Sequence, residues 1–385
     1  MNILTITTLY PNQKQFRHGV FIETRLRHLV ETGEAKARVV APVPWFPFKS
    51  DRFKQYAIYA EVPKFEQRNG IDIYHPRYLV IPKIGMLLTP FFMALSLYWQ
   101  VKTLQKQQKI DLIDAHYFYP DGVAVTLVNK VLKIPFIISA RGTDINLIPE
   151  YKLPRKMILW AAKQANASVT VCKALKDSMV EMGANADKIH VYRNGVDLEL
   201  FKLLDKPKCR DKYQLKKQTL VSVGHLIERK GHHLIIEAMQ FLPDYELLIV
   251  GGGEEENALK KLVKQLKLDD KVKFLGEKKQ QELTEIYNAA DAMVLASSRE
   301  GWANVLLESM ACGTPVVATD IWGTPEVVQN QDAGVLVKRT ADDIAEGVKN
   351  LFSNYPARSN TRKYAEQFSW DSTTQGLLHL FKECI

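Results

Sequence analysis

The chain has 385 residues, and its 46% hydrophobic and 25% charged residues are typical of a globular protein of two or three domains, which excludes long disorder and collagen-like repeats. Basic residues outnumber acidic ones by nine, and the first half carries the excess: residues 1–198 hold 27 basic and 16 acidic side chains, whereas the remainder holds 25 and 27. This asymmetry favours an acidic partner for the first half, such as an anionic membrane surface, a phosphorylated acceptor or a nucleic acid.

Short β-branched runs alternate with amphipathic stretches along both halves of the chain. The predicted strands of the first half are 3–8, 37–43, 71–74, 111–115, 135–139, 167–171 and 189–192, and its predicted helices include 20–31, 90–107 and 153–166. The predicted strands of the second half are 219–223, 245–250, 272–275, 291–296, 315–318 and 334–337. Because a parallel connection needs a crossover, this alternation predicts an α/β fold with two doubly wound, Rossmann-like domains.

The domain boundary is predicted after residue 198, where the sequence becomes polar and rich in lysine without strong periodicity. The expected parts are a first domain of residues 1–198, a second of residues 199–367, and a C-terminal helix within 368–385 that crosses back to the first domain. No low-complexity linker separates the two domains, so we expect them to face each other across a cleft. Open α/β sheets bind ligands at the carboxyl ends of their strands.

Cysteine usage and the N-terminus bear on the compartment. The four cysteines are scattered without a C-x-x-C pair or a metal-ligand spacing, which predicts reduced thiols in a cytosolic protein. The N-terminus lacks a basic n-region and is typical of a strand rather than of a signal peptide. The longest apolar stretch, residues 84–99, is shorter than the ~20 residues that span a bilayer. A cytoplasmic protein that at most lies on a membrane is expected.

The most informative window follows the predicted strand 291–296. A helix is predicted to begin at Asn304, and the free N–H groups of its first turn form a ready anion site. Glu308 then lies ~6 Å along the helix axis, where a carboxylate can hold a vicinal diol such as a ribose. Glu300, in the preceding loop, can reach a second polyol ring. The alternative is that Glu300 is an ordinary loop carboxylate and Glu308 a solvated helix residue without a ligand. The predicted donor-binding residues of this window are Gly301, Trp302, Ala303, Asn304, Val305 and Glu308.

A second window follows the first strand of the second domain. Gly224 closes that strand, and Arg229 and Lys230 precede a predicted helix at 232–239. Both side chains suit phosphate oxygens, although a merely basic loop is an equal alternative. The glycine turn 251–253 indicates only a bend or a close approach of the backbone. Neither a G-x-G-x-x-G after a first strand nor a P-loop motif is present, which disfavours NAD binding and a P-loop ATPase.

In the first half, polar residues follow predicted strands. His116 stands at the carboxyl end of one strand, where it can be structural or functional. Arg141 and Asp144 follow the next strand and can bind substrate or simply pair with each other. Gly19, at the start of the first helix, can let a phosphate or a sugar approach closely.

Together these windows resemble the family-four glycosyltransferases, retaining enzymes of the GT-B fold that use nucleotide-sugar donors. The resemblance covers nearly the whole chain and is strongest from residue 221 to residue 328. The segment from Glu300 to Glu308 is similar to the E-x7-E element of the family, and residues 194–201 are similar to its N-G-V-D-x-x-x-F stretch between the domains. The first domain would then bind the acceptor and the second the donor.

The resemblance implies a role for each site residue. Lys230 and a nearby arginine would neutralise the donor diphosphate, Glu308 would hold the ribose, and Glu300 would engage the transferred sugar. His116 matches a strand-end histidine near the donor sugar, and Gly19 matches a glycine loop, so His116 and Glu300 are the predicted catalytic residues. No metal and no cofactor are expected, because protein cations take the place of Mg²⁺ at the leaving diphosphate.

Three positions depart from the family pattern. His225 stands where an arginine commonly follows the glycine, so Arg229 is expected to supply the missing cation unless the phosphate clamp is weaker. Arg141 replaces the histidine that is usual before Gly-x-Asp, and Trp322 replaces one glycine of a pair after Asp320. The last two bear on the choice of sugar and acceptor.

The predicted reaction is transfer of a hexose-type sugar, with retention, from a UDP- or GDP-sugar to a hydroxyl of a glycan or lipid-linked acceptor. Alternatives on the same frame are a nucleotide-sugar epimerase and a sugar phosphorylase. A nucleic acid is not an expected partner, because aromatic and basic residues do not interleave. Docking on the inner face of an anionic membrane is expected from the basic first half and from the stretch 84–99, flanked by Lys83 and Lys102; the alternative is that residues 90–107 form a core helix.

Overall fold

The chain folds into two α/β units, each built on its own mainly parallel sheet, in a computed structural model that describes all residues except 17, 51, 53–54 and 82–84. The first unit comprises Met1–Arg193 and Asp371–Ile385, and the second comprises Asn194–Trp370. The predicted class of two doubly wound domains, with a C-terminal helix that returns to the first, is confirmed.

The unit boundaries differ from the predicted positions 198 and 367 because both connecting segments bond within the second unit. The Val196 N–H donates to the Phe368 carbonyl at 2.9 Å. Gly195 lies so close to Trp370 that an added Cβ would be 2.6 Å from the Trp370 nitrogen. Residues 194–197 and 368–370 therefore run side by side and belong to one body.

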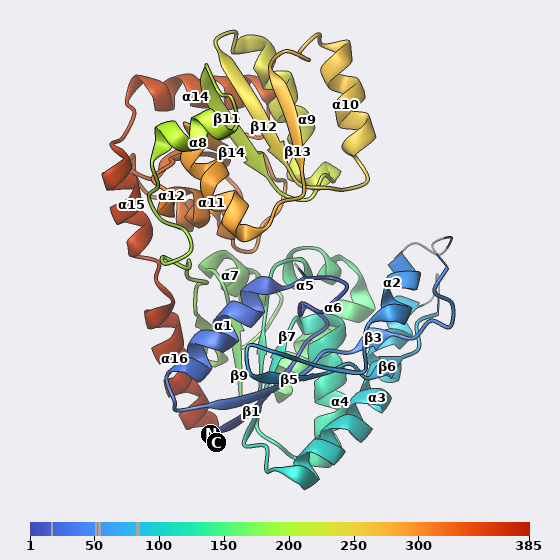
Figure 1. The fold of residues 1–385 in the computed structure, drawn as a ribbon. Helices are drawn as coiled ribbons and strands as arrows, with labels where there is room; N and C mark the ends of the chain where they lie inside the picture. Colours follow the sequence, from blue (N-terminus) through green and yellow to red (C-terminus); the bar gives the residue numbers. More distant parts are fainter. Residues whose placement is uncertain (17, 51, 53–54, 82–84) are drawn as a thin grey trace. The chain divides into compact units, whose positions relative to one another are not determined.

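The first sheet has eight strands in the order β10-β9-β8-β7-β1-β2-β5-β4, all parallel except β4, which runs antiparallel to β5 (Figure 1). Its strands are β1 (Asn2–Ile6), β2 (Lys36–Val40), β4 (Phe65–Arg68), β5 (Ile71–Tyr74), β7 (Leu112–His116), β8 (Phe136–Ser139), β9 (Ala167–Thr170) and β10 (Ile189–Val191). The short strands β3 (Val43–Pro44) and β6 (Arg77–Tyr78) form a separate parallel pair. The strand order reverses between β1 and β7, so the loops that follow these two strands meet at one edge.

Helices cover the first sheet. They are α1 (Val20–Glu31), α2 (Gln55–Glu61), α3 (Gly85–Gln107), α4 (Val123–Leu132), α5 (Thr143–Asn146), α6 (Lys152–Gln164), α7 (Lys173–Glu181) and, after the second unit, α16 (Trp370–Cys384). Leu377 and Phe381 of α16 share a buried cluster with Ile22 and Leu26 of α1, and Figure 1 shows these two helices side by side. The last helix thus completes the core of the first unit.

Helix α3 begins five residues before Pro90, the residue at which the sequence predicted its start. Proline has no N–H to bond the carbonyl of the residue four positions earlier, which here is Met86. The Tyr119 hydroxyl donates to that carbonyl instead and so allows the helix to continue through the proline. Neither α3 nor any other helix in the described part of the chain is long and apolar enough to cross a bilayer.

The second sheet has six parallel strands in the order β13-β12-β11-β14-β15-β16. They are β11 (Gln218–Val223), β12 (Tyr245–Val250), β13 (Val272–Gly276), β14 (Ala292–Leu295), β15 (Val316–Thr319) and β16 (Gly334–Val337). Its helices are α8 (Lys206–Lys212), α9 (His232–Ala238), α10 (Glu256–Gln265), α11 (Gln280–Ala289), α12 (Asn304–Ala311), α13 (Thr324–Val327), α14 (Ala341–Ser353) and α15 (Arg358–Glu366). The order reverses between β11 and β14, which brings the loops of the two informative sequence windows together.

Candidate active site

Lys230 and Glu300 form an ion pair at the carboxyl edge of the second sheet, on the loops that follow β11 and β14. Lys230 Nζ donates to Glu300 Oε1 at 2.6 Å, and Ser297 Oγ donates to the same oxygen at 2.7 Å. Arg229 Nη1 lies 3.7 Å from it. Burial raises the pKa of Glu300, but Lys230 and Arg229 together outweigh burial and hold the pKa below its usual value. The structure thus joins three predicted site residues and keeps this carboxylate ionised.

Glycines allow the loops after β11, β12 and β14 to pack backbone against backbone. Gly251 has a φ of 142°, and an added Cβ would lie 1.9 Å from the Gly224 carbonyl oxygen. Gly231 has a φ of 69°, and an added Cβ would lie 2.1 Å from the Ala296 carbonyl oxygen. The glycine turn after β12 is therefore explained by close approach to the protein's own backbone.

The first turn of α12 has no side-chain cap, and the helix begins at the predicted residue. Gly301, Trp302 and Ala303 before it are buried, whereas Asn304 and Val305 are half-buried. The Trp302 ring packs against Phe368, with 6.1 Å between the ring centroids. The loop before the helix is thus fixed by packing, and no side chain competes for the N–H groups of the first turn on which the predicted anion site depends.

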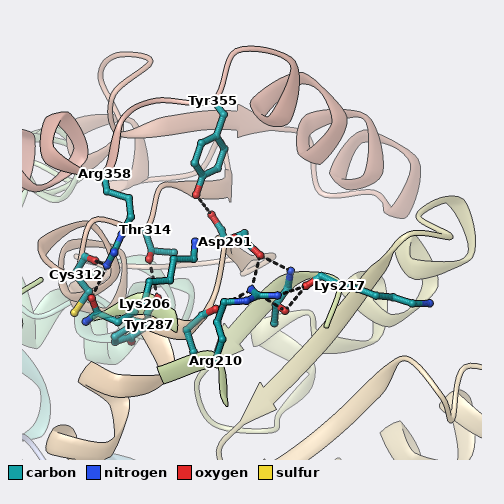
Figure 2. A network of polar contacts seen from close by, with 12 residues as sticks. Lys206, Arg210, Lys217, Tyr287, Asp291, Cys312, Thr314, Tyr355 and Arg358 are labelled. Carbon is teal, nitrogen blue, oxygen red and sulfur yellow. Dashed lines mark hydrogen bonds and ion pairs between the residues drawn. The ribbon is translucent and has the colours of Figure 1, made fainter. Parts of the chain in front are cut away.

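Glu308 lies on the second turn of α12 and is half-buried. The Tyr287 hydroxyl donates to its Oε2 at 3.1 Å. Burial raises the pKa of Glu308 to about 7, which the bond from Tyr287 only partly opposes. Thr314 Oγ1 donates to the Tyr287 carbonyl at 2.7 Å, a contact drawn in Figure 2. Tyr287 was missed in the sequence because it lies 21 positions before Glu308, on α11, where no motif marks it.

Figure 2 shows a second group that the sequence did not reveal, around Asp291 at the amino end of β14. Asp291 Oδ2 accepts from the Thr219 N–H at 2.7 Å and from Arg210 Nη1 at 2.9 Å, and Oδ1 accepts from Lys206 Nζ at 2.6 Å. The Tyr355 hydroxyl donates to the Asp291 carbonyl at 2.6 Å. Since Thr219 lies at the start of β11, these bonds tie β11 to β14 at the edge opposite Lys230 and have a structural role.

His116 ends β7, and its side chain is only 2% exposed. Arg141 Nε donates to His116 Nδ1 at 3.2 Å, so the ring proton lies on Nε2, which donates to Asp114 Oδ2 at 3.0 Å. Arg25 of α1 lies 3.1 Å from Nε2 and 3.4 Å from Asp114 Oδ2. Burial, aided by Arg141 and Arg25 and opposed by Asp114, lowers the pKa of His116 to about 3. The histidine is therefore neutral and is held on both ring nitrogens.

Asp144 orders the backbone beside His116. Its Oδ2 accepts from the Phe118 N–H at 2.8 Å, and its Oδ1 accepts from the N–H groups of Arg141 at 3.0 Å and Gly142 at 2.8 Å. Asp144 is fully buried, whereas the Arg141 guanidinium reaches His116 and lies 5.5 Å from the ring centroid of Phe21. These bonds make Asp144 a positioning residue for the loops after β7 and β8.

Gly19 closes the loop between β1 and α1. Its φ is 72°, and an added Cβ would lie 2.2 Å from the Leu9 carbonyl oxygen, so only glycine fits here. Asp121, from the turn after β7, accepts from the Thr8 N–H and, at 3.1 Å, from Thr8 Oγ1. Burial raises the pKa of Asp121 to about 7. Asp121 was missed because its partner lies 113 positions away in the sequence.

His225 and Trp322, two of the positions that depart from the family pattern, both lie on loops of the second unit. His225 is exposed on the loop after β11. Trp322 has a φ of 45°, in the left-handed region that glycine adopts without strain. Among the residues that the structure describes, no group of three or more His, Cys, Asp or Glu side chains is arranged to hold a metal ion.

Two family models match the chain. The model described as Glycosyltransferase Family 4 matches residues 59–200, in the first unit and the connecting segment. The model described as Glycosyl transferases group 1 matches residues 205–368 and therefore includes Lys230, Glu300 and Glu308. His116, Arg141 and Asp144 lie within the first match.

Individual proteins resemble the whole chain. The putative teichuronic acid biosynthesis glycosyltransferase TuaC of Bacillus subtilis is 27% identical over 361 residues, which cover 90% of this chain and 88% of TuaC. Sucrose-phosphate synthase from Thermosynechococcus elongatus has a TM-score of 0.83 at 17% identity, with 100% of this chain and 98% of that chain covered. The Anabaena protein Alr3699/HepE, solved in complex with UDP-glucose, has a TM-score of 0.75 at 19% identity over the full length of both chains.

Proposed function

Because the chain belongs to the family 4 and group 1 glycosyltransferases and has the GT-B fold, we propose that it transfers a hexose-type sugar from a UDP- or GDP-sugar, with retention and without a metal. The acceptor is a hydroxyl of a glycan or of a lipid-linked intermediate, in the cytoplasm or at the inner face of its membrane. The pairing of Lys230 with Glu300 beside the uncapped start of α12 is the observation that carries the proposal. The name of the Bacillus relative supports polysaccharide assembly, and the UDP-glucose complex of the Anabaena protein supports a nucleotide-sugar donor.

When the donor binds, its diphosphate replaces Glu300 as the partner of Lys230. Without donor, Lys230 Nζ is satisfied by Glu300 at 2.6 Å. A diphosphate at the first turn of α12 offers the ammonium group oxygens of higher charge, and Arg229 supplies a second cation. Glu300, released in its ionised state, then accepts hydrogen bonds from hydroxyls of the transferred sugar. In the empty site Lys230 and Glu300 therefore bond each other. When the donor is bound, Lys230 pairs with its phosphate and Glu300 accepts from its sugar.

The ribose is assigned to Glu308. A carboxylate whose pKa is about 7 is partly protonated at neutral pH. Two hydroxyls of a ribose donate to the ionised form and favour it, so donor binding removes a proton from Glu308. The Tyr287 hydroxyl, 3.1 Å from Oε2, keeps the carboxylate oriented meanwhile.

Chemistry in this site consists of positioning and charge stabilisation. The bond to a nucleoside diphosphate already has a good leaving group once Lys230, Arg229 and the α12 dipole stabilise its charge. We assign the acceptor proton to the leaving phosphate and His116 to the transferred sugar. His116 is neutral, and Arg141 must leave Nδ1 before that nitrogen can meet a sugar hydroxyl.

The first experiment measures thermal shifts of the protein with UDP-, GDP- and ADP-sugars. A donor at ~100 times its Kd is expected to stabilise the protein by about 2.7 kcal/mol. Lys230→Ala should weaken that donor by roughly 1.5–3 kcal/mol, because one charge-assisted contact is lost. Lys260→Ala is the matched control: this lysine also pairs with a glutamate at 2.6 Å, but on the exposed face of α10. Equal donor affinity in wild type and Lys230→Ala, with the fold intact, contradicts the assignment. Isomerised free nucleotide sugar in the absence of an acceptor indicates an epimerase instead.

A second experiment separates binding from catalysis. Glu300→Gln should lower kcat by at least about tenfold, whereas UDP or GDP affinity should hold or rise, since Lys230 loses a competing partner. His116→Ala should also lower kcat more than nucleotide affinity. Turnover is measured with the donor identified by thermal shift, and nucleotide affinity by calorimetry. A parallel loss of bare-nucleotide affinity in both variants would place these residues at the phosphate rather than at the sugar.

A further inference from the structure

Helix α3 is apolar on two opposite faces. Its inner face is buried among α4, β6 and the turn after β7, with Met93, Leu97 and Val101 at 0% exposure. An α-helix turns by about 100° per residue, so residues 88, 91, 95 and 99 lie within about 80° of one another on the side away from that core. We call these four residues, Leu88, Phe91, Leu95 and Trp99, the outer face of α3. They are 39%, 49%, 63% and 61% exposed.

The outer face belongs to a larger apolar region. Twenty large apolar side chains of the described residues are exposed, and eleven of them lie between Trp45 and Trp99. Such a concentration in one seventh of the chain is unlike the scattered single residues of an ordinary protein surface. Seven of the eleven lie on α2 and α3. In the first unit α2 packs against β3, β3 pairs with β6, and β6 packs against α3 (Figure 1).

The charged residues of the chain segment that contains the outer face of α3 are all basic. No acidic residue occurs from residue 73 to residue 110, although five basic residues do. Lys102 and Lys106 continue the line of the outer face toward the end of α3, at the same angular position on the helix. Lys102 Nζ lies 5.6 Å from the ring centroid of Trp99, so the cation and the aromatic ring adjoin. Lys83 and Ile84, at the other end of the predicted apolar stretch, lie outside the described residues.

We propose that the outer face of α3 inserts into the headgroup and upper acyl region of an anionic phospholipid bilayer, with Lys102 and Lys106 at the lipid phosphates. An apolar stripe that ends in tryptophan and lysine fits the interface, where aromatic rings and snorkelling lysines concentrate. The buried inner face of α3 agrees with the alternative of a core helix, but the outer face stays exposed among the residues that the structure describes. None of the residues of this surface is among those assigned to the phosphate, the ribose or the transferred sugar.

A bilayer fits this surface better than a second copy of the chain. A twofold interface between two such faces would leave Lys102 and Lys106 of each copy without any acidic residue of α3 to pair with. Anionic headgroups neutralise the same lysines. Each lysine is expected to raise the affinity for an anionic bilayer about fivefold. The charge pattern therefore selects lipid over self-association.

The test is co-sedimentation of the full-length protein with vesicles, without donor or acceptor. Wild type should bind phosphatidylcholine–phosphatidylglycerol vesicles at low salt, bind phosphatidylcholine vesicles weakly, and lose most binding at high salt. The double variant L95S/W99S should lower the partition coefficient at least about tenfold, and K102A/K106A should lower it mainly on anionic vesicles. Phe241→Ser is the control, since Phe241 is 47% exposed but lies in the second unit.

A spectroscopic readout distinguishes insertion from surface charge alone. The blue shift of tryptophan emission on vesicle addition should fall in Trp99→Phe while binding persists. The proposal is overturned if wild type ignores anionic vesicles at low salt, or if L95S/W99S binds as well as wild type. It is also overturned if light scattering finds a lipid-free dimer that L95S/W99S converts to a monomer. Turnover with a soluble acceptor is measured separately, so failure here leaves the proposed reaction unaffected, and failure of the reaction leaves the lipid result standing.

Discussion

Two carboxylates eight positions apart have opposite electrostatics in this protein. Glu300 is buried but faces Lys230 and Arg229, so its pKa lies below the usual value. Glu308 lies about one turn into α12 with a tyrosine hydroxyl as its partner, and burial raises its pKa to about 7. Of this pair, only Glu308 changes its charge near neutral pH.

This difference predicts a pH-dependent effect of Glu308→Gln on stability. A carboxyl whose folded pKa is about 7 and whose usual pKa is 4.5 binds more protons folded than unfolded between these values. Its contribution to the free energy of unfolding therefore falls as pH rises from about 4.5 to about 7. Glutamine does not titrate, so Glu308→Gln should gain roughly 1–3 kcal/mol relative to wild type between pH 5 and pH 8.

Urea unfolding of both proteins at the two pH values measures this gain. Glu256→Gln serves as the control, because Glu256 is an exposed helix residue paired with Lys260. If the difference between Glu308→Gln and wild type is the same at both pH values, the carboxylate is not the neutral-pH titrating group that its burial implies.

The candidate site residues that the sequence predicted are those marked by local context. Lys230, Glu300 and Glu308 stand where a strand ends and a helix begins, so their neighbours in sequence already indicate a ligand site. Tyr287 bonds Glu308 and Asp121 bonds Thr8 from other elements of their own units, and these partnerships depend on tertiary packing that no local pattern encodes. For His116 the sequence placed the residue at the strand end but not its burial, which follows from Arg25 of α1 and Arg141.

At the scale of elements, all the strands predicted from β-branched runs are present, and their ends agree within two residues except for the predicted 37–43, which runs three residues beyond β2. Among the strands that were not predicted, which include the short β6, β4 (Phe65–Arg68) is an antiparallel edge strand with two charged residues. Its hydrogen bonds to β5 rather than its composition make it a strand. The start of α3 was wrong by five residues because the Tyr119 hydroxyl offsets the bond that Pro90 cannot make. Both misses are cases in which a distant partner overrides a local preference.

Close packing of the strand-end loops predicts a specific cost for Gly251→Ala. The new Cβ would meet the Gly224 carbonyl oxygen at 1.9 Å, so the loops after β11 and β12 must separate. The free energy of unfolding should fall by about 3 kcal/mol or more, at or above the upper end of the usual cost of overpacking an interior site. Gly276→Ala is the matched control: its φ is 67°, but nothing lies within 4 Å of the new Cβ, so only the backbone strain of about 1 kcal/mol applies.

Chemical denaturation of the two variants decides between strain and clash. A loss for Gly251→Ala no larger than that for Gly276→Ala would mean that the loops yield easily. The tight contact between the loops after β11 and β12 would then not be what fixes the position of Lys230 on the first of these loops.

At the scale of the whole molecule, the chain leaves the first unit at Arg193 and returns to it at Asp371. Phe381 of α16 is fully buried in the core that also contains Ile22 and Leu26. Phe381→Ala should therefore destabilise the first unit by about 3–5 kcal/mol, the usual cost of emptying a buried aromatic site.

Amide hydrogen exchange can assign that loss to one unit. Exchange should accelerate in β1 and α1 and remain unchanged in β11 and β12. Leu351→Ala, in the buried cluster of the second unit, should give the reverse pattern. Acceleration in the second sheet of Phe381→Ala would show that the two units unfold together.

The return of α16 also sets an order of events during synthesis. Residues 371–385 emerge from the ribosome after every residue of the second unit, so the half of the protein that is translated first waits longest for its last helix. Until then Ile22, Leu26 and their neighbours lack the side chains that cover them. In a nascent chain of this protein, the second unit can therefore fold before the first unit has buried its core. The apolar surface that α16 later covers is the surface that chaperones would bind.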